Sequence, residues 1–313
     1  MIRSVINFYN NHLSLWVVFF AIIAYLFPSD FVRIKPYINF FFAVTMFGIG
    51  LVITEEDYKN IIKTPFIILF GNLCQFTIMP LLALLTASIF NLPNEFTIGL
   101  ILTGSAPGAM TSNIITYLSH GDTAYSVSLT ALATLLCPIL TPLLTFLLAG
   151  KITPVPFGSM FLTIIYTVVV PLIIGFVVRK YFTDFVNKIT EIPPAISVTS
   201  IIIICSYVVA ANKTNLGKAT VIIFIAVISH NFVGMILGYY AGAVGRLDFK
   251  RKKTLSIEIG MQNAGLGVVL ALQHFSAEVA IPGVIFTIWC IISASILINF
   301  WIFLEKRENS RKI

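Results

Sequence analysis

One acidic side chain of this sequence lies where a charge is costly. Of the thirteen Asp and Glu residues, Glu258 alone falls inside an apolar run, beyond Lys253 and just before Gly260. A carboxylate held inside a membrane costs several kcal/mol unless a positive charge neutralises it. We expect no Lys or Arg within the apolar runs, so a mobile cation must supply that charge. The cation is either a proton or a metal ion.

Oxygen-bearing side chains at a similar depth indicate which cation is bound. Ser112 and Asn113 lie near the end of one apolar run, and Ser126 and Thr130, four residues apart, share one face of the next. Hydroxyl and amide oxygens around a single carboxylate form a hard site that suits Na⁺. A divalent ion normally recruits more carboxylates, and zinc prefers His or Cys. The oxygen-rich surround therefore favours sodium, and a proton stays open as an alternative.

A second oxygen site is expected on the other side of Glu258. Gln75 and Gln262 each place an amide within an apolar run, and carbonyl groups freed by a broken helix would complete the site. Two alternatives stay open. The hydroxyls could bond within or between helices, and Glu258 could reach cytoplasmic water by snorkelling. The cluster as a whole is more specific than any of its members.

The elements that carry these residues are predicted to be membrane helices. The chain is 58% hydrophobic and 11% charged, with a mean hydropathy of +0.96, and apolar runs of roughly 20 residues follow one another along it. A water-soluble enzyme, a nucleic-acid-binding protein and a secreted disulfide scaffold are excluded. The net charge of +7 needs no nucleic acid, because the basic residues are expected in short loops. The four cysteines lie in apolar runs without paired spacing, which is typical of packing residues.

Loops that carry charge or turn residues divide the chain into ten predicted spans. Most Lys and Arg residues fall on the same side as both termini. The positive-inside rule therefore predicts a multi-pass protein of the cell membrane with both termini in the cytoplasm. The predicted spans cover residues 13–28, 37–54, 65–90, 96–119, 123–149, 156–178, 193–212, 217–245, 253–275 and 279–304.

The ten spans divide into two halves, residues 1–150 and 151–313. Each half holds an odd number of spans, so the second enters the membrane from the opposite side, as in an inverted repeat. The fourth span of each half carries residues that weaken a helix, namely the stretch 104–108 with its proline, and Gly260 with Gly265 and Gly267. Paired interruptions of this kind are typical of a transporter site.

The eighth span predicts close helix contacts. Gly234, Gly238 and Gly242 follow the spacing that lets membrane helices approach one another. His230 and Asn231 lie in the middle of the span, where a hydrogen bond to a neighbouring helix is expected. Neither feature requires a ligand.

Two stretches of the sequence resemble a known family. The sequence GSAPGAMTSN at residues 104–113, the sequence IEIGMQNAG at residues 257–265 and the ten-span layout are similar to bacterial members of the bile acid:sodium symporter family. The resemblance covers essentially the whole chain. It implies a panel built from spans 1, 2, 6 and 7, a core built from spans 3–5 and 8–10, and broken spans 4 and 9 that cross.

The resemblance also implies two sodium ions and a site for the transported molecule. The residues that match the first sodium site are Ser112, Asn113, Ser126, Thr130 and Glu258. Those that match the second are Gln75, Glu258 and Gln262, with the backbone carbonyls of Ile259 and Met261. In the family the substrate binds between core and panel, which here points to Pro107, Gly108, Met110, Thr111, Asn263 and Cys290.

The function implied by the resemblance is sodium-coupled symport of an organic anion by alternating access. A bile acid or a similar amphipathic carboxylate is the expected substrate. Family members that bind bile acids carry a polar pair just after the tryptophan of span 10, whereas Cys290 and Ile291 follow Trp289 here. A small carboxylate such as pantoate is therefore an open alternative. Half-helix N-termini at the breaks would attract a carboxylate in either case.

Other classes of function find less support in the residues. An intramembrane protease would need H-E-x-x-H, G-x-G-D or a Ser–Lys pair at depth, and the sequence offers none of these. Broken helices could also line a passive channel. The sequence predicts a transporter and not an enzyme. Its expected partners are the lipid bilayer, sodium and a small organic anion, with no cofactor besides sodium, no nucleic acid and no obligate protein partner.

Overall fold

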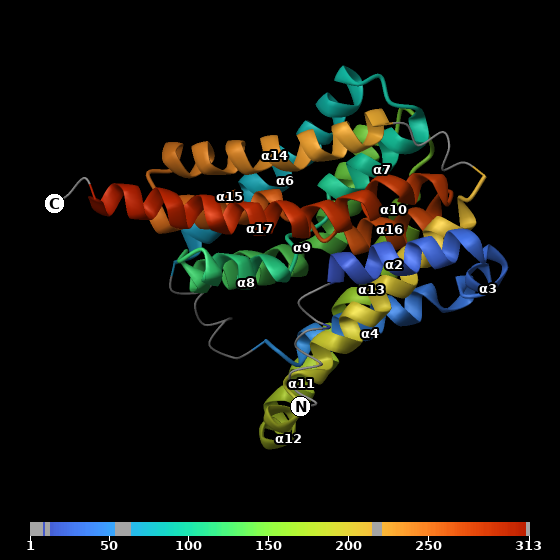
Figure 1. Cartoon of the computed structure of the whole chain (residues 1–313), viewed down its shortest axis with the longest axis horizontal. Helices are drawn as coiled ribbons and strands as arrows, with labels where there is room; N and C mark the ends of the chain where they lie inside the picture. Colours follow the sequence, from blue (N-terminus) through green and yellow to red (C-terminus); the bar gives the residue numbers. More distant parts are fainter. Residues whose placement is uncertain (1–8, 10–12, 54–63, 215–220, 311–313) are drawn as a thin grey trace.

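The chain is all-helical in the part that the structure describes. The computed structural model describes residue 9 and residues 13–53, 64–214 and 221–310, and these ranges contain no β-strand. The helical elements, labelled as in Figure 1, are α2 (Leu13–Leu26), α3 (Pro28–Val32), η1 (Lys35–Tyr37), α4 (Ile38–Gly50), α6 (Pro65–Ile89), α7 (Asn94–Gly104), α8 (Thr111–Leu118), α9 (Thr123–Ala149), α10 (Phe157–Ile164), η2 (Ile165–Val169), α11 (Val170–Tyr181), α12 (Thr183–Lys188), α13 (Ile192–Ala211), α14 (Val221–Val244), α15 (Phe249–Gly260), α16 (Ala264–His274), η4 (Glu278–Ala280) and α17 (Ile281–Ser310).

Among the described residues, six helices are long and apolar enough to cross a membrane. A helix rises about 1.5 Å per residue, so about 20 residues span the roughly 30 Å of a hydrocarbon core. The chain is therefore a multi-pass membrane protein. The six helices are Pro65–Ile89, Thr123–Ala149, Phe157–Tyr181, Ile192–Ala211, Val221–Val244 and Glu278–Phe303.

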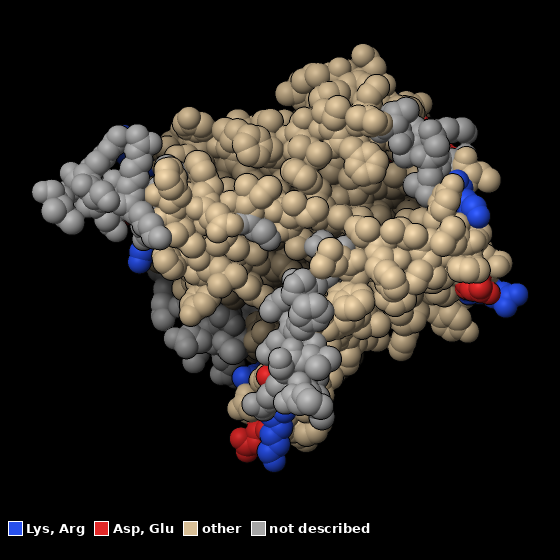
Figure 2. Space-filling view, viewed as in Figure 1, with Lys and Arg blue, Asp and Glu red and all other residues tan. Residues whose placement is uncertain are grey.

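The outer surface of these helices is apolar. Large side chains such as Phe66 and Leu73 on α6, and Val221 and Phe232 on α14, are exposed. Figure 2 shows Lys, Arg, Asp and Glu gathered toward the ends of the molecule, with a broad uncharged area between them. Such an apolar surface suits contact with lipid tails. The backbone is compatible with lipid as well, because a helix satisfies its own hydrogen bonds.

The fourth and ninth predicted spans are interrupted. Residues 105–110 separate α7 from α8, and residues 261–263 separate α15 from α16. In Figure 1, α8 and α15 lie toward the left of the view and α7 and α16 toward the right. The prediction of a broken helix in each half is therefore confirmed.

The second break does not include all the glycines that were expected to cause it. Gly260 ends α15, but Gly265 and Gly267 lie inside the continuous helix α16. A Cβ on Gly267 would lie 3.2 Å from the Cα of Thr103. The expectation for these two glycines is thus wrong, and Gly267 allows close packing of α16 against α7.

The ninth span begins earlier than predicted. The carboxylate of Asp248 caps α15 by accepting a hydrogen bond from the backbone N–H of Arg251, so the helix starts at Phe249. The basic run 250–253 was expected in a loop and lies in this helix instead. Lys253 is buried, with its Nζ 5.4 Å from the centre of the Phe249 ring. The prediction that every basic residue lies in a loop is wrong at this point.

The helices pack in two groups. In one group, α13 packs against α2, α3 and α4, and α11 also packs against α4. In the other, α6 packs against α7, α9 and α14, while α14 packs against α15 and α17. Figure 1 shows the first group at the lower right and most of the second above and to the left of it.

The contacts of α14 agree with its sequence. A Cβ on Gly238 would lie 2.9 Å from the carbonyl oxygen of Leu255, so this glycine permits close approach of α14 and α15. The Nε2 of His230 lies 3.0 Å from the carbonyl oxygen of Met79 on α6. Both the predicted close packing and the predicted hydrogen bond between helices are confirmed.

Some predicted features lie outside the described residues. They include the end of span 2 at residue 54 and the start of span 8 at residue 217. The ten-span inverted repeat and the cytoplasmic placement of both termini stay predictions. Loop and tail residues that lie outside the described ranges are Arg3, Glu55, Glu56, Asp57, Lys59, Lys63, Lys218, Arg311 and Lys312.

Candidate cation site

The two helix breaks lie against each other. The backbone N–H of Ala109 donates to the carbonyl of Met261 at 2.8 Å, and the N–H of Asn263 donates to the carbonyl of Pro107 at 2.8 Å. A broken helix leaves backbone groups without partners inside the protein, and this pairing satisfies four of them. The crossing therefore fixes the relative position of the two broken helices.

Gly108 lies where the crossing meets the buried carboxylate. It forms an isolated antiparallel bridge with Gln262. A Cβ at this position would lie 2.9 Å from Glu258 Oε2, which is closer than real Cβ contacts normally come. Glycine therefore lets the backbone lie directly against Glu258.

Glu258 is held by hydroxyl groups from two helices. Its side chain on α15 is 3% exposed, which contradicts the alternative in which it reaches water. Ser112 Oγ on α8 donates to Oε1 at 2.5 Å, and Ser126 Oγ on α9 donates to the same oxygen. Thr130 Oγ1, one turn further along α9, donates to Oε2 at 2.9 Å. The structure thus brings together the residues that the sequence placed at one depth.

Oxygen lone pairs outnumber hydroxyl hydrogens in this cluster. Besides Glu258, Ser126 Oγ contacts Asn113 Oδ1 at 2.8 Å and Thr116 Oγ1 at 3.2 Å. Thr130 Oγ1 also contacts Asn113 Oδ1 at 3.3 Å and the carbonyl oxygen of Ser126 at 3.0 Å. A hydroxyl has one hydrogen and cannot donate fully to several oxygens at once. The surplus of lone pairs is the property that a hard cation requires.

The residues expected at the second site form a hydrogen-bonded chain. Gln75 Nε2 on α6 donates to Gln262 Oε1 at 2.8 Å, and Gln262 Nε2 donates to the carbonyl of Ile259 at 2.8 Å. The carbonyl of Met261 accepts the hydrogen bond from Ala109 at the crossing. Each carbonyl oxygen has a second lone pair, so these bonds leave both carbonyls able to accept another partner.

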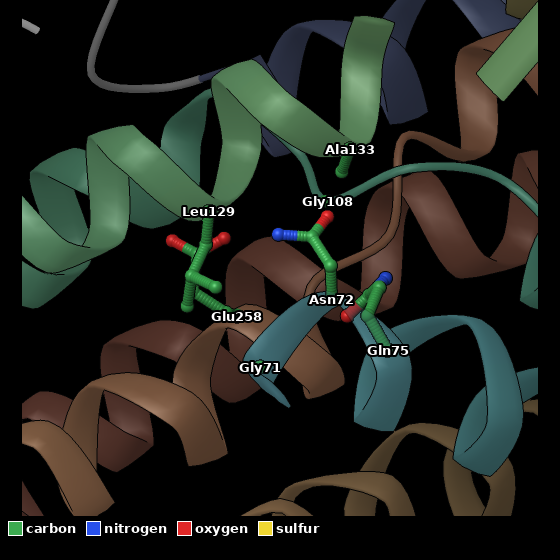
Figure 3. A pocket seen from close by; sticks show the side chains of 7 residues that line it. All are labelled: Gly71, Asn72, Gln75, Gly108, Leu129, Ala133 and Glu258. Atoms are coloured by element: carbon green, nitrogen blue, oxygen red, sulfur yellow. The ribbon is translucent and has the colours of Figure 1, made fainter. Parts of the chain in front are cut away.

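A cavity of about 10 Å³ lies between Glu258 and Gln75. Figure 3 shows the side chain of Asn72 between these two residues, with Leu129 and Gly108 at the edge of the cavity. A space of this size holds about one water-sized sphere. The geometry therefore admits a single small ion beside the carboxylate.

Two polar residues of this region escape the sequence analysis. Thr116 follows Ser112 by four residues on α8, and Asn72 precedes Gln75 by three residues on α6. Residues at these spacings share a helix face, which is the signal that could have identified them.

Asp122 holds α9 and α15 in register. Its Oδ1 caps α9 by accepting from the N–H of Tyr125 at 3.0 Å, and its Oδ2 pairs with Arg251 Nε at 3.0 Å. Its own N–H donates to Thr254 Oγ1 at 2.9 Å. These contacts fix the height of the α9 hydroxyls relative to Glu258.

Most residues expected to bind substrate lie at the crossing. Pro107 and Gly108 are buried there, Met110 is half-buried just before α8, and Thr111 is exposed at the first position of that helix. No side chain caps the N-terminus of α8. Its positive dipole end is thus available to an anion.

The remaining two expected substrate residues have partners of their own. Asn263 is half-buried and caps α16, its Oδ1 accepting a hydrogen bond from the N–H of Leu266 at 3.2 Å. Cys290 is buried in α17, with its Sγ 3.4 Å from the carbonyl oxygen of Thr287. Both are candidates by resemblance to the family.

Comparisons with known proteins identify the family of the chain. The model of the Sodium Bile acid symporter family matches residues 39–219. The chain is also 40% identical over 301 residues to the "Uncharacterized sodium-dependent transporter YocS" of Bacillus subtilis (strain 168), an alignment that covers 96% of this chain and 94% of the relative. The chain belongs to the sodium bile acid symporter family.

Plant relatives extend this family comparison. Two proteins named "Probable sodium/metabolite cotransporter BASS1, chloroplastic" are each 32% identical to the chain. The protein of Arabidopsis thaliana aligns over 289 residues, 92% of this chain and 72% of the relative. The protein of Oryza sativa subsp. japonica aligns over 288 residues, 91% of this chain and 71% of the relative.

The donor set of this family member suits a hard cation. Among the described residues, no group of three His, Cys, Asp or Glu side chains is placed to hold a metal ion. The cluster instead combines one carboxylate with hydroxyl and amide oxygens. Zinc and multi-carboxylate divalent sites are disfavoured by this composition.

Proposed function

We propose that this family member is a sodium-coupled symporter of organic anions that works by alternating access. The relatives described above are named as a sodium-dependent transporter and as sodium/metabolite cotransporters. The transported anion is a carboxylate, for which a bile acid and pantoate represent the amphipathic and the small class. The protein lies in the cell membrane with both termini in the cytoplasm.

The surplus of oxygen lone pairs around Glu258 carries this proposal. Three hydroxyls bond a buried carboxylate, the amide oxygen of Asn113 contacts two of these hydroxyls, and the lone pairs of these oxygens outnumber the hydroxyl hydrogens. A proton on Glu258 would satisfy one oxygen of the cluster. A sodium ion accepts lone pairs from several oxygens at once, so it fits the cluster better than a proton does.

Two sodium ions would share the same carboxylate. The first would be held by Ser112, Asn113, Ser126, Thr130 and Glu258. The second would be held by Gln75, Glu258 and Gln262 with the carbonyls of Ile259 and Met261. Glu258 neutralises part of both charges, so binding of either ion stabilises the crossing of the two helix breaks.

The substrate carboxylate would bind at the same crossing. The N-termini of α8 and α16 begin there, and both attract negative charge. Pro107, Gly108, Met110, Thr111, Asn263 and Cys290 are the proposed substrate residues. Sodium binding would order this region first, so the anion would bind more tightly when sodium is present.

The two packing groups provide the parts that move. The group of α2, α4, α11 and α13 is the proposed panel, and the group of α6 to α9 with α14 to α17 is the proposed core. Movement of the core against the panel would expose the crossing to each side of the membrane in turn. The two halves 1–150 and 151–313 are proposed to be the inverted repeats.

Uptake into liposomes tests the proposed function. We expect an inward sodium gradient to drive accumulation of radiolabelled taurocholate or pantoate above its external concentration. An equal proton gradient without sodium should produce no accumulation. Uptake that is the same with and without the sodium gradient would contradict coupling, and flux that never exceeds equilibration would indicate a channel.

Removal of one hydroxyl from the cluster should weaken sodium binding. We expect Ser126→Ala to raise the sodium concentration for half-maximal thermal stabilisation about tenfold, because loss of a polar partner at a charged group costs about 1.5 kcal/mol. Ser128→Ala is the matched control. Ser128 is also buried on α9, but its Oγ donates to its own helix at Ala124, 2.7 Å away. Equal sodium responses in the two variants would contradict the assignment.

A further inference from the structure

Asn72 is a buried amide whose oxygen lacks a partner. The side chain is 4% exposed on α6, and its Nδ2 donates to the carbonyl of Ile68 at 3.1 Å. Only the nitrogen of the amide can donate to a carbonyl, so this bond directs Oδ1 away from it. Oδ1 has no hydrogen-bond partner. A buried polar atom in this condition calls for an explanation, such as a bound ion or water molecule.

Gln75 shows the same arrangement one turn further along α6. It is 5% exposed, its Nε2 bonds Gln262, and its Oε1 has no hydrogen-bond partner. Asn72 and Gln75 are three residues apart and therefore share one helix face. Both line the cavity that Glu258 also lines, as Figure 3 shows.

Three of the residues that line the cavity thus carry acceptor oxygens. Glu258 contributes a carboxylate, and Asn72 and Gln75 each contribute an amide oxygen without a partner. The other side chains of the wall, those of Leu129 and Ala133, are apolar. A water molecule could donate to the two amide oxygens but brings no charge, whereas a cation accepts lone pairs from both and also neutralises the Glu258 carboxylate.

We propose that Asn72 Oδ1 is a further ligand of a sodium ion held between Glu258 and Gln75. The inference rests on the proposed function, since it adds an α6 ligand to the second of the two sodium ions. Asn72 is held by its bond to Ile68 on a regular stretch of helix. It therefore offers its oxygen from a fixed position, without the reorganisation that a mobile side chain would require.

Sodium titrations of the purified full-length protein test this assignment. Thermal unfolding in detergent is followed as sodium chloride replaces choline chloride at constant ionic strength. Asn72→Leu keeps the side-chain size but removes the oxygen, and we expect it to raise the half-maximal sodium concentration at least about fivefold. Asn212→Leu is the matched control. Asn212 is also a buried asparagine, and like Asn72 it donates from Nδ2 to the carbonyl four residues earlier, here that of Val208.

A second variant gives a readout that a structural role would not produce. Asn72→Asp keeps an oxygen at this position and places two carboxylates around the cavity. Calcium resembles sodium in size and prefers sites with more carboxylates. We therefore expect calcium chloride to stabilise Asn72→Asp and to leave wild type unaffected. This test does not depend on the folding of Asn72→Leu.

The outcomes separate this inference from the proposed function. Asn72→Leu with a sodium response within twofold of wild type, or Asn72→Asp without a calcium response, would overturn the role of Asn72 while leaving sodium coupling intact. A wild-type protein that sodium does not stabilise would contradict the proposed function and this ligand with it.

Discussion

Glu258→Gln is expected to abolish the response of the protein to sodium. The amide keeps the size of the side chain but removes the negative charge that both proposed ions share. We expect the half-maximal sodium concentration to rise at least about 100-fold, equivalent to about 2.8 kcal/mol, and sodium-driven uptake to be lost. The measurements are the sodium titration of thermal unfolding and the liposome assay.

The stability of Glu258→Gln without sodium distinguishes this effect from misfolding. A buried neutral amide avoids the cost of burying a charge, so the variant should unfold at the same temperature as wild type or higher when sodium is absent. Glu95→Gln is the control, because Glu95 is exposed at the start of α7. A sodium response of wild-type size in Glu258→Gln would contradict the proposed coupling site.

Gly108→Ala is expected to cause the second largest loss. Its Cβ would lie 2.9 Å from Glu258 Oε2, and Thr130 already bonds that oxygen at 2.9 Å. The carboxylate cannot move away without losing this hydroxyl, and the crossing backbone cannot withdraw without losing its hydrogen bonds to Met261 and Asn263. We expect sodium affinity and uptake to fall at least about tenfold, or about 1.4 kcal/mol for binding.

Gly158→Ala is the control for the effect of adding a methyl group. Gly158 lies in the first turn of α10, and a Cβ there would meet nothing within 4 Å. This variant should keep the wild-type sodium response and gain slightly in helix stability. If Gly108→Ala binds sodium as wild type does, the close contact between Gly108 and Glu258 does not constrain the ion site.

Much of the candidate site could be predicted because its residues are unusual in a membrane. A carboxylate inside an apolar run must be compensated, so Glu258 stands out without any knowledge of the fold. Ser126 and Thr130 follow from helical spacing. Pro107 locates a helix break from local chemistry alone, because proline removes a backbone donor.

Other parts of the site depend on how the helices rotate and begin. Asn72 resembles any amide on a membrane helix until the packing of α6 turns it toward Glu258. Lys253 was expected in a loop, but the cap at Asp248 starts the helix before it and the fold buries it. Gly265 and Gly267 resemble helix breakers in sequence, whereas α16 continues through both of them and the Cα of Thr103 lies close to Gly267.

The sequence by itself determined that the chain is a set of membrane helices and that two of them break, and it predicted a cation beside Glu258. These properties are local, because hydropathy, proline and a lone carboxylate act on their own segment. Only the tertiary structure decided that the two breaks pair with each other and that α6, α8 and α9 face Glu258 together. Sequence gives the depth of a residue along its helix, but the direction in which its side chain points depends on contacts with helices distant in the chain.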